Sequence, residues 1–89
     1  MKAFDWNEEK NTANKRKHGI GFEDAVLVFL DPLHIVLHDR EHSEVEERWK
    51  AYGEVYSELT VVSFTERPGA TWLISARKAT RRERREYYG

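Results

Sequence analysis

The hydrophobic and polar positions divide the chain into a helical first third and a strand-forming remainder. Between residues 22 and 30, apolar side chains recur at the spacing of a core-facing helix, at Phe22, Ala25, Val26, Phe29 and Leu30. We expect Asp31-Pro32 to end this helix, because the residue before a proline is disfavoured in the α region. Gly19-Ile20-Gly21 is short enough to join it to a preceding helix in an αα-hairpin.

That preceding helix is expected over residues 8–18, and it is unusually polar. Asn7 is a suitable N-cap, and Gly19 suits a C-cap with positive φ. One face carries Lys10, Asn14 and Lys17, at i, i+4 and i+7. Because a helix that is polar nearly all round gains little from burial, we expect it to be held by few contacts or covered by a partner.

Beyond Pro32 the pattern favours strands. Four are predicted, over residues 33–38, 47–55, 59–67 and 71–77, and residues 4–6 form a further short strand or an anchoring arm. One side of the predicted strand over residues 47–55 carries Trp49, Ala51, Gly53 and Val55. Pro68-Gly69 predicts a turn, and we expect a loop longer than two residues there, because that turn type splays a two-residue hairpin.

The end of the chain carries a capping box, with Thr80 as N-cap and Glu83 at N3, which predicts a short basic helix over residues 81–88. The expected fold is therefore α+β: two N-terminal helices, an antiparallel sheet of about four strands, and a C-terminal helix, with the helices on one face of the sheet. With 89 residues, the chain has room for one domain, which we assign to residues 1–89.

Composition excludes several classes of protein. The chain has no cysteine, which excludes disulfides, thiolate zinc sites and cysteine nucleophiles. Aromatic residues make up 12% of the chain, which argues against disorder. No apolar run approaches the roughly 20 residues that span a bilayer, and the N-terminal segment does not resemble a signal peptide. We therefore expect a cytoplasmic protein that does not bind membranes.

The net charge of −1 conceals an uneven distribution. Residues 2–18 carry five basic and three acidic residues, residues 19–66 three and eleven, and residues 67–89 seven and two. If the two basic ends meet in space, they form a positive surface suited to an anionic ligand. The alternative is that the charges only keep a small domain soluble.

Few residues suggest metal or hydrolase chemistry. The chain has no phosphate-binding glycine loop and no serine in a Gly-flanked elbow. His34, His38 and His42 are spaced by four, but on a strand His34 and His38 lie about 13 Å apart at roughly 3.3 Å per residue. We therefore expect no metal and no cofactor.

Arginine and one histidine are better candidates. Arg48, Arg67 and Arg77 fall within or at the end of predicted strands, where a guanidinium can bind phosphate bidentately; the alternative is that they form salt bridges. His18, at the end of the first helix, is suited to proton transfer near neutral pH, or else it caps the last helical carbonyls.

Three segments in order resemble the BrnT family of toxins: KNTANKRKHGIGFEDAVLVFLDP, EERWKAYG and ISARKATRRERREYY. This family is similar in fold to the RelE/ParE superfamily, and its members are ribonucleases of type II toxin–antitoxin modules. The resemblance implies a RelE-like domain, an RNA substrate and a BrnA-type ribbon-helix-helix antitoxin. It also implies that the chain contacts operator DNA only through the antitoxin complex.

RelE-like nucleases resemble one another in using basic residues and a tyrosine or histidine in place of a metal. We therefore predict a metal-independent endoribonuclease in which the ribose 2′-OH attacks the adjacent phosphate. The predicted catalytic residues are His18, Arg48, Arg77 and Tyr87, and the predicted substrate-binding residues are Lys10, Lys17, Arg67 and Arg84. ParE-like relatives inhibit gyrase without nuclease chemistry, so the alternative is a non-catalytic binding module that inhibits a macromolecular target or acts only with its antitoxin on the operator.

Overall fold

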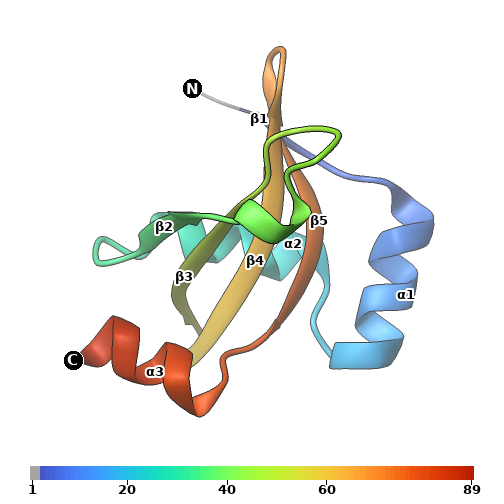
Figure 1. Cartoon of the computed structure of the whole chain (residues 1–89). Helices are drawn as coiled ribbons and strands as arrows, with labels where there is room; N and C mark the ends of the chain where they lie inside the picture. The colour runs from blue at the N-terminus through green and yellow to red at the C-terminus, as the bar shows by residue number, and fades with distance from the viewer. Residues whose placement is uncertain (1–2) are drawn as a thin grey trace.

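The computed structural model describes residues 3–89 as a mixed five-stranded sheet flanked by helices (Figure 1). The elements are β1 (Ala3–Asp5), α1 (Glu8–His18), α2 (Phe22–Ala25), η1 (Val26–Leu30), β2 (Ile35–His38), η2 (Arg40–His42), β3 (Trp49–Val55), β4 (Glu58–Arg67), β5 (Ala70–Lys78) and α3 (Arg81–Tyr88). The strand order is β1-β5-β4-β3-β2, so β2 and β1 are the sheet edges. No helix among residues 3–89 has the length and apolar character needed to cross a membrane.

The α+β class is confirmed, but the expected antiparallel sheet of about four strands is wrong in detail. The fifth strand is β1, which pairs in parallel with the start of β5, from Ala3–Ala70 to Asp5–Trp72. A three-residue strand is too short to show a hydrophobic period, so its partner is decided by tertiary contacts. The other neighbours are antiparallel, with β4 and β5 paired from Thr60–Lys78 to Arg67–Ala70.

The second helix forms where expected but changes its geometry. It is α-helical only to Ala25 and continues as the 3₁₀ helix η1 to Leu30. Phe22, Ala25 and Val28 follow one another at i, i+3 spacing across this junction, and all three are fully buried. Leu30, which an α-helical spacing places on the core stripe, is instead 71% exposed.

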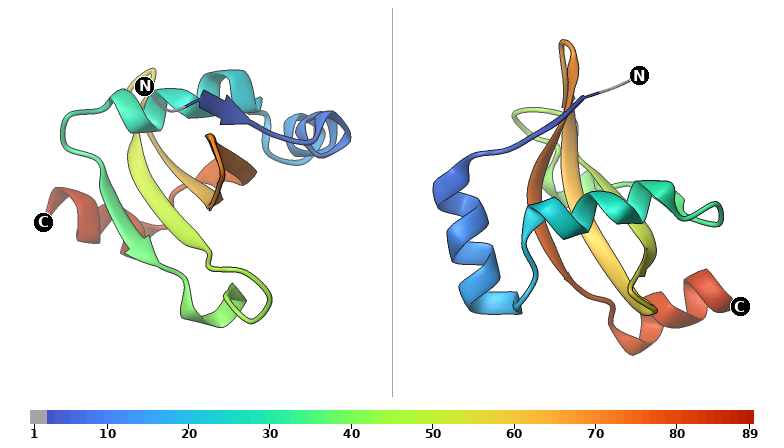
Figure 2. Two further views of the ribbon diagram at one scale, coloured as in Figure 1. Left: turned by 90° about the horizontal axis from the view of Figure 1, so that it is seen from above. Right: turned by 180° about the vertical axis from the view of Figure 1, so that it is seen from behind.

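The helices do not all lie on one face of the sheet, contrary to expectation. Helices α2 and η1 cross one face, α3 and η2 lie on the other, and α1 stands beside the β5 edge (Figures 1 and 2). The face under α2 and η1 is the main core, and its largest fully buried side chains are Phe22, Val28, Val62 and Leu73. The opposite face carries a second cluster of Tyr52, Leu59 and Val61, against which Tyr87 of α3 packs. This second apolar cluster is the reason α3 docks there.

The polar helix α1 begins and ends where predicted, with Asn7 as N-cap and Gly19 as C-cap at φ 75°. Its lysine face is turned to β5, and Asn14 in the middle of that face is buried. The Asn14 amide donates to the Ala76 carbonyl (2.8 Å) and accepts from the Ala76 N–H (3.1 Å). Asn11 in turn accepts from the Phe22 N–H at 2.8 Å. Amide-to-backbone bonds therefore hold this helix in place of an apolar stripe.

The hairpin of β4 and β5 has a tight turn at its end and a bulge in its middle. The loop after β4 is shorter than expected: Pro68 and Gly69 alone connect Arg67 to its partner Ala70. Gly69 at φ 78° adopts the left-handed backbone that such a tight turn requires. Between β4 and β5, pairing passes from Ser63–Ser75 to Phe64–Leu73, so Ile74 is an extra residue in β5 and forms a bulge.

Candidate functional site

The face of the sheet that carries α3 is hollowed between η2 and β5. A pocket of about 260 Å³ opens there, which we name the η2 pocket, and it is lined by Asp39, His42, Arg48, Lys50, Ser63, Ile74, Ser75 and Arg77. Asp39, His42 and Arg48 come from η2 and the chain on either side of it, and the other side chains come from β3, β4 and β5. The lining is mostly polar and carries three side chains that are always or normally cationic, which suits an anionic ligand.

Asp39 and His42 form a carboxylate–imidazole pair at one side of this pocket. The His42 Nδ1 lies 2.9 Å from the Asp39 Oδ2. The Asp39 side chain is only 7% exposed, whereas that of His42 is 57% exposed. Because a carboxylate oxygen accepts, this contact turns Nδ1–H toward Asp39 and leaves Nε2, which keeps a lone pair in the neutral ring, on the other side of the imidazole. An imidazole oriented in this way is suited to accept a proton from a substrate.

Ser43 fixes this pair beside the start of β3. Its Oγ donates to the Asp39 carbonyl at 2.6 Å and accepts from the Arg48 N–H at 2.9 Å. The Asp39 N–H also donates to the Arg48 carbonyl at 2.9 Å. One short stretch of loop therefore brings a histidine and an arginine into the same pocket.

Arg48 is the arginine of the pocket without an ionic partner. Its guanidinium forms no ion pair within residues 3–89, and its Nε is buried without a hydrogen-bond partner there. An unsatisfied buried donor costs roughly 1–3 kcal/mol, which an oxyanion bound beside it would recover. Arg48 is thus available to bind a phosphate.

Arg77 is already engaged. Its two terminal nitrogens bind the two oxygens of Glu83 at 2.7 and 3.0 Å, in bidentate geometry. The Arg77 hydrogen bonds, together with the Thr80 N–H and against the effect of burial, lower the pKa of Glu83 to about 2. The salt bridge that the sequence left open as an alternative is therefore present, and it ties α3 to β5 at the edge of the η2 pocket.

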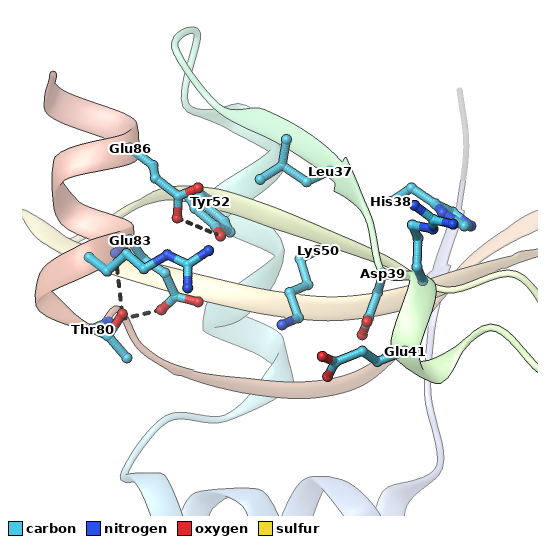
Figure 3. Close-up of a pocket in the computed structure, with 11 residues that line it drawn as sticks. Leu37, His38, Asp39, Glu41, Lys50, Tyr52, Thr80, Glu83 and Glu86 are labelled. Atoms are coloured by element: carbon cyan, nitrogen blue, oxygen red, sulfur yellow. Dashed lines mark hydrogen bonds between the residues drawn. The ribbon is translucent and has the colours of Figure 1, made fainter.

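A larger pocket of about 530 Å³, which we name the α3 pocket, shares Asp39 and Lys50 with the η2 pocket and extends under α3. Figure 3 shows Lys50 between Tyr52 and Asp39. The Tyr52 hydroxyl donates to Glu86 at 3.4 Å, and burial raises the pKa of Tyr52 to about 12, so this hydroxyl stays protonated at neutral pH. Lys50 forms no ion pair within residues 3–89 and is free to contact an anion in either pocket.

The other predicted site residues lie elsewhere. His18 lies at the end of α1, where it lines a groove between α1 and β5 together with Lys10 and Lys17. We name this recess the α1 groove. It adjoins the η2 pocket, since Ile74 and Ser75 line both. The structure thus brings Arg48 and Arg77 together, and places His18, Lys10 and Lys17 on the neighbouring surface.

Tyr87, Arg67 and Arg84 have structural partners away from the η2 pocket. The Tyr87 hydroxyl donates to Asp31, and burial together with this bond raises the pKa of Tyr87. Arg67 pairs with Glu46 at 3.5 Å and lies over the Trp72 ring at 4.3 Å. Arg84 lies 3.9 Å from Glu58.

The three evenly spaced histidines have separate partners. His34 contacts the Asp31 carbonyl at 2.8 Å, His38 pairs with Glu47, and His42 with Asp39. Within residues 3–89 there is no group of three or more His, Asp or Glu side chains that could hold a metal ion.

Sequence reasoning missed Asp39, His42 and Lys50 as site residues. Residues 39–46 read as a charged loop, and the i, i+3 spacing of Asp39 and His42 was the one local indication that they interact. Lys50 alternates with the apolar positions of β3, which places it on the opposite face of the sheet from Trp49 and Ala51. That pattern does not indicate which other side chains lie near Lys50 on that face.

Together, an oriented imidazole, an unpaired arginine and an unpaired lysine can move a proton and neutralise charge on a phosphate. No curated protein matches the chain. A family model described as "Ribonuclease toxin, BrnT, of type II toxin-antitoxin system" matches residues 6–83, most of the chain. The match implies an antitoxin partner and an RNA substrate, and the chain belongs to the BrnT family of ribonuclease toxins.

Proposed function

We propose that this chain is a single-domain, metal-independent endoribonuclease toxin that cleaves cytoplasmic RNA in the η2 pocket. The observation that carries the proposal is the Asp39–His42 pair beside the unpaired Arg48 and Lys50. These groups supply a base and fixed positive charge from side chains alone, which is what cleavage by the neighbouring ribose hydroxyl requires.

In the proposed reaction, the His42 Nε2 takes the proton of the ribose 2′-OH. The 2′-oxygen then forms a bond to phosphorus, and the bond from phosphorus to the 5′-oxygen breaks. Arg48 neutralises the developing charge on the phosphate, and Lys50 donates a proton to the departing 5′-oxygen. Solvent water then carries the proton from His42 back to Lys50, which restores both groups. The products are a 2′,3′-cyclic phosphate and a 5′-OH. Arg77 contributes positive charge at the edge of the pocket while it remains bound to Glu83.

The geometry favours His42 over His18 as the base. His42 is held by a buried carboxylate within the pocket that contains Arg48, whereas His18 lines the adjoining groove. Tyr87 donates to Asp31 outside the η2 pocket, so Lys50 is a better placed proton donor. Roles for His18 and Tyr87 remain predictions from the family resemblance.

The experiment is cleavage of a defined RNA by the purified chain in the presence of EDTA. We expect products with 5′-OH and 2′,3′-cyclic phosphate ends, identified by mass spectrometry. A requirement for a divalent ion would contradict the proposed mechanism, and the absence of intrinsic cleavage would favour a non-catalytic module that binds a macromolecular target. The His42→Ala variant, prepared in parallel, controls for a contaminating nuclease.

We further propose that the antitoxin is a BrnA-like ribbon-helix-helix protein through which the complex binds operator DNA. We expect it to cover part of the basic surface formed by α1 and α3. Lys10, Lys17, Arg81 and Arg82 support this location, because they form no ion pair within residues 3–89. In the complex, amide hydrogens of residues 8–18 or 81–88 should be protected from exchange. If both stretches exchange as fast as in the free toxin, the antitoxin neutralises it from another surface.

A further inference from the structure

The α1 groove is a second recess that the proposed reaction does not use. It has a volume of about 210 Å³ and lies between α1 and the middle of β5. Lys10, Lys17 and His18 line it on the helix side, and Ile74 and Ser75 on the strand side. Because Ile74 and Ser75 also line the η2 pocket, the two recesses adjoin across the bulge in β5.

Among the described residues, no carboxylate forms an ion pair with the lysines of this groove. Lys10 and Lys17 form no ion pair within residues 3–89, although the chain carries 16 acidic residues. Lys15, on the same helix, is paired with Glu23 at 3.3 Å. Two lysines of α1 without an ion pair in the described structure thus line the groove, and the paired Lys15 lies outside its lining.

The arrangement fits an extended anion. Lys10 and Lys17 are seven residues apart, which is about 10 Å along a helix at 1.5 Å per residue. They can therefore contact different phosphates of one strand. From the groove, the same strand would continue over Ser75 to Arg48 in the η2 pocket. A single strand can bend from one recess into the other, whereas a rigid A-form duplex cannot.

We propose that the α1 groove is a binding site for the phosphodiester backbone that flanks the cleaved bond, so that the substrate is a single-stranded RNA longer than a dinucleotide. Lys10 and Lys17 bind flanking phosphates and take no part in the chemical step. This inference rests on the proposed function, because the groove has this role only if RNA occupies the η2 pocket.

The test measures binding of uncleavable 2′-O-methyl RNA strands of two, four, six and ten nucleotides by fluorescence anisotropy. For the wild-type chain, we expect affinity to rise with length beyond two nucleotides. The double variant Lys10→Ala, Lys17→Ala should lose about tenfold in affinity for the ten-nucleotide strand and none for the dinucleotide. Its salt dependence should become shallower by about 1.4 in log–log slope, because each single-strand phosphate contact contributes roughly 0.7.

Lys15→Ala is the matched control, since it removes the same charge from the same helix but outside the groove. It should bind all strands within twofold of the wild type. Equal loss in Lys15→Ala, or full retention of affinity in the double variant, would overturn the proposed groove site.

Cleavage assays separate this result from the proposed function. If the wild type cuts RNA and the double variant cuts and binds long strands equally well, the groove proposal fails and the ribonuclease proposal stands. If the wild type cuts nothing yet binds long strands through Lys10 and Lys17, the groove binds RNA and the proposed chemistry fails.

Discussion

The two faces of the sheet are built from the same strands and differ in almost every other respect. On the face under α2 and η1, Phe22, Val28 and Leu73 are at most 1% exposed and pack against one another. On the face that carries α3, the strands present Lys50, Ser63 and other polar side chains to an open pocket. Apolar burial stabilises the first face. The second combines the smaller Tyr52, Leu59 and Val61 cluster with a pocket in which Arg48 and Lys50 form no ion pair within residues 3–89.

The difference indicates where stability and activity reside. Substitutions on the face under α2 and η1 should change the free energy of unfolding, and substitutions in the η2 pocket should change the rate of RNA cleavage. The Arg77–Glu83 pair should affect both stability and cleavage, because it lies at the edge of the η2 pocket and also holds α3 on the sheet. Substitutions on each face therefore test whether this separation is real.

The largest effect is expected from His42→Ala. Loss of the proposed base should lower the rate of RNA cleavage by about 10³-fold, which corresponds to about 4 kcal/mol of transition-state stabilisation. The melting temperature should change little, because the side chain is 57% exposed. Single-turnover cleavage and thermal unfolding measure the two quantities.

His18→Ala provides the comparison for that experiment. We expect a smaller loss of cleavage, confined to long RNA, because His18 lines the α1 groove. If His18→Ala abolishes cleavage and His42→Ala does not, the general base is the histidine indicated by the family resemblance, and the assignment to the η2 pocket is wrong.

On the face under α2 and η1, Leu73→Ala should lower the free energy of unfolding by about 3 kcal/mol. The side chain is 1% exposed in the main core, so truncation leaves a cavity that the surrounding strands cannot fill. Urea denaturation measures the loss, and cleavage per folded molecule should stay unchanged. Val45→Ala, at a site that is 99% exposed, should change the free energy of unfolding by less than about 0.5 kcal/mol.

Arg48→Ala and Arg77→Ala should separate the two arginines of the pocket. Each should lower cleavage by about 10²-fold, or about 2.7 kcal/mol. Arg48→Ala should leave the melting temperature nearly unchanged, since its guanidinium forms no ion pair within residues 3–89 and its Nε has no hydrogen-bond partner there. Arg77→Ala, by contrast, should lower the melting temperature, because Glu83 loses both of its guanidinium hydrogen bonds. Equal stability of the two variants would show that the Arg77–Glu83 pair does not hold α3.

The smallest expected effect is on the stability of the fold in acid, through Glu83. The pKa of Glu83 is lowered from 4.5 to about 2 in the folded chain, so its stabilisation is complete above about pH 4.5 and is lost as the pH falls toward 2. We expect Glu83→Gln to lower the free energy of unfolding by about 2 kcal/mol at neutral pH. The variant should also lose less stability than the wild type between pH 4.5 and 2. Urea denaturation at several pH values measures both, and parallel curves would contradict this account of the pair.

Helix ends and most strands were predictable because their determinants are local. The N-cap Asn7, the C-cap Gly19 and the Thr80–Glu83 capping box act within a few residues, and each is present in the structure. The alternation of Trp49, Ala51, Gly53 and Val55 likewise identified the core side of β3. Arg48 and Arg77 were predicted as catalytic residues together with His18 and Tyr87, and of these four the two arginines line the η2 pocket.

The sequence alone determined the α+β class, the polar character of α1 and the presence of basic residues at both ends of the chain, because composition and short-range spacing carry these properties. The tertiary structure alone decided that β1 pairs in parallel with β5, that α3 docks on the face opposite α2, and that Asn14 supports the edge of β5. It also decided that Asp39 orients His42 next to Arg48. Contacts between residues far apart along the chain depend on strand register and on which face each side chain occupies, and no short stretch of sequence contains that information.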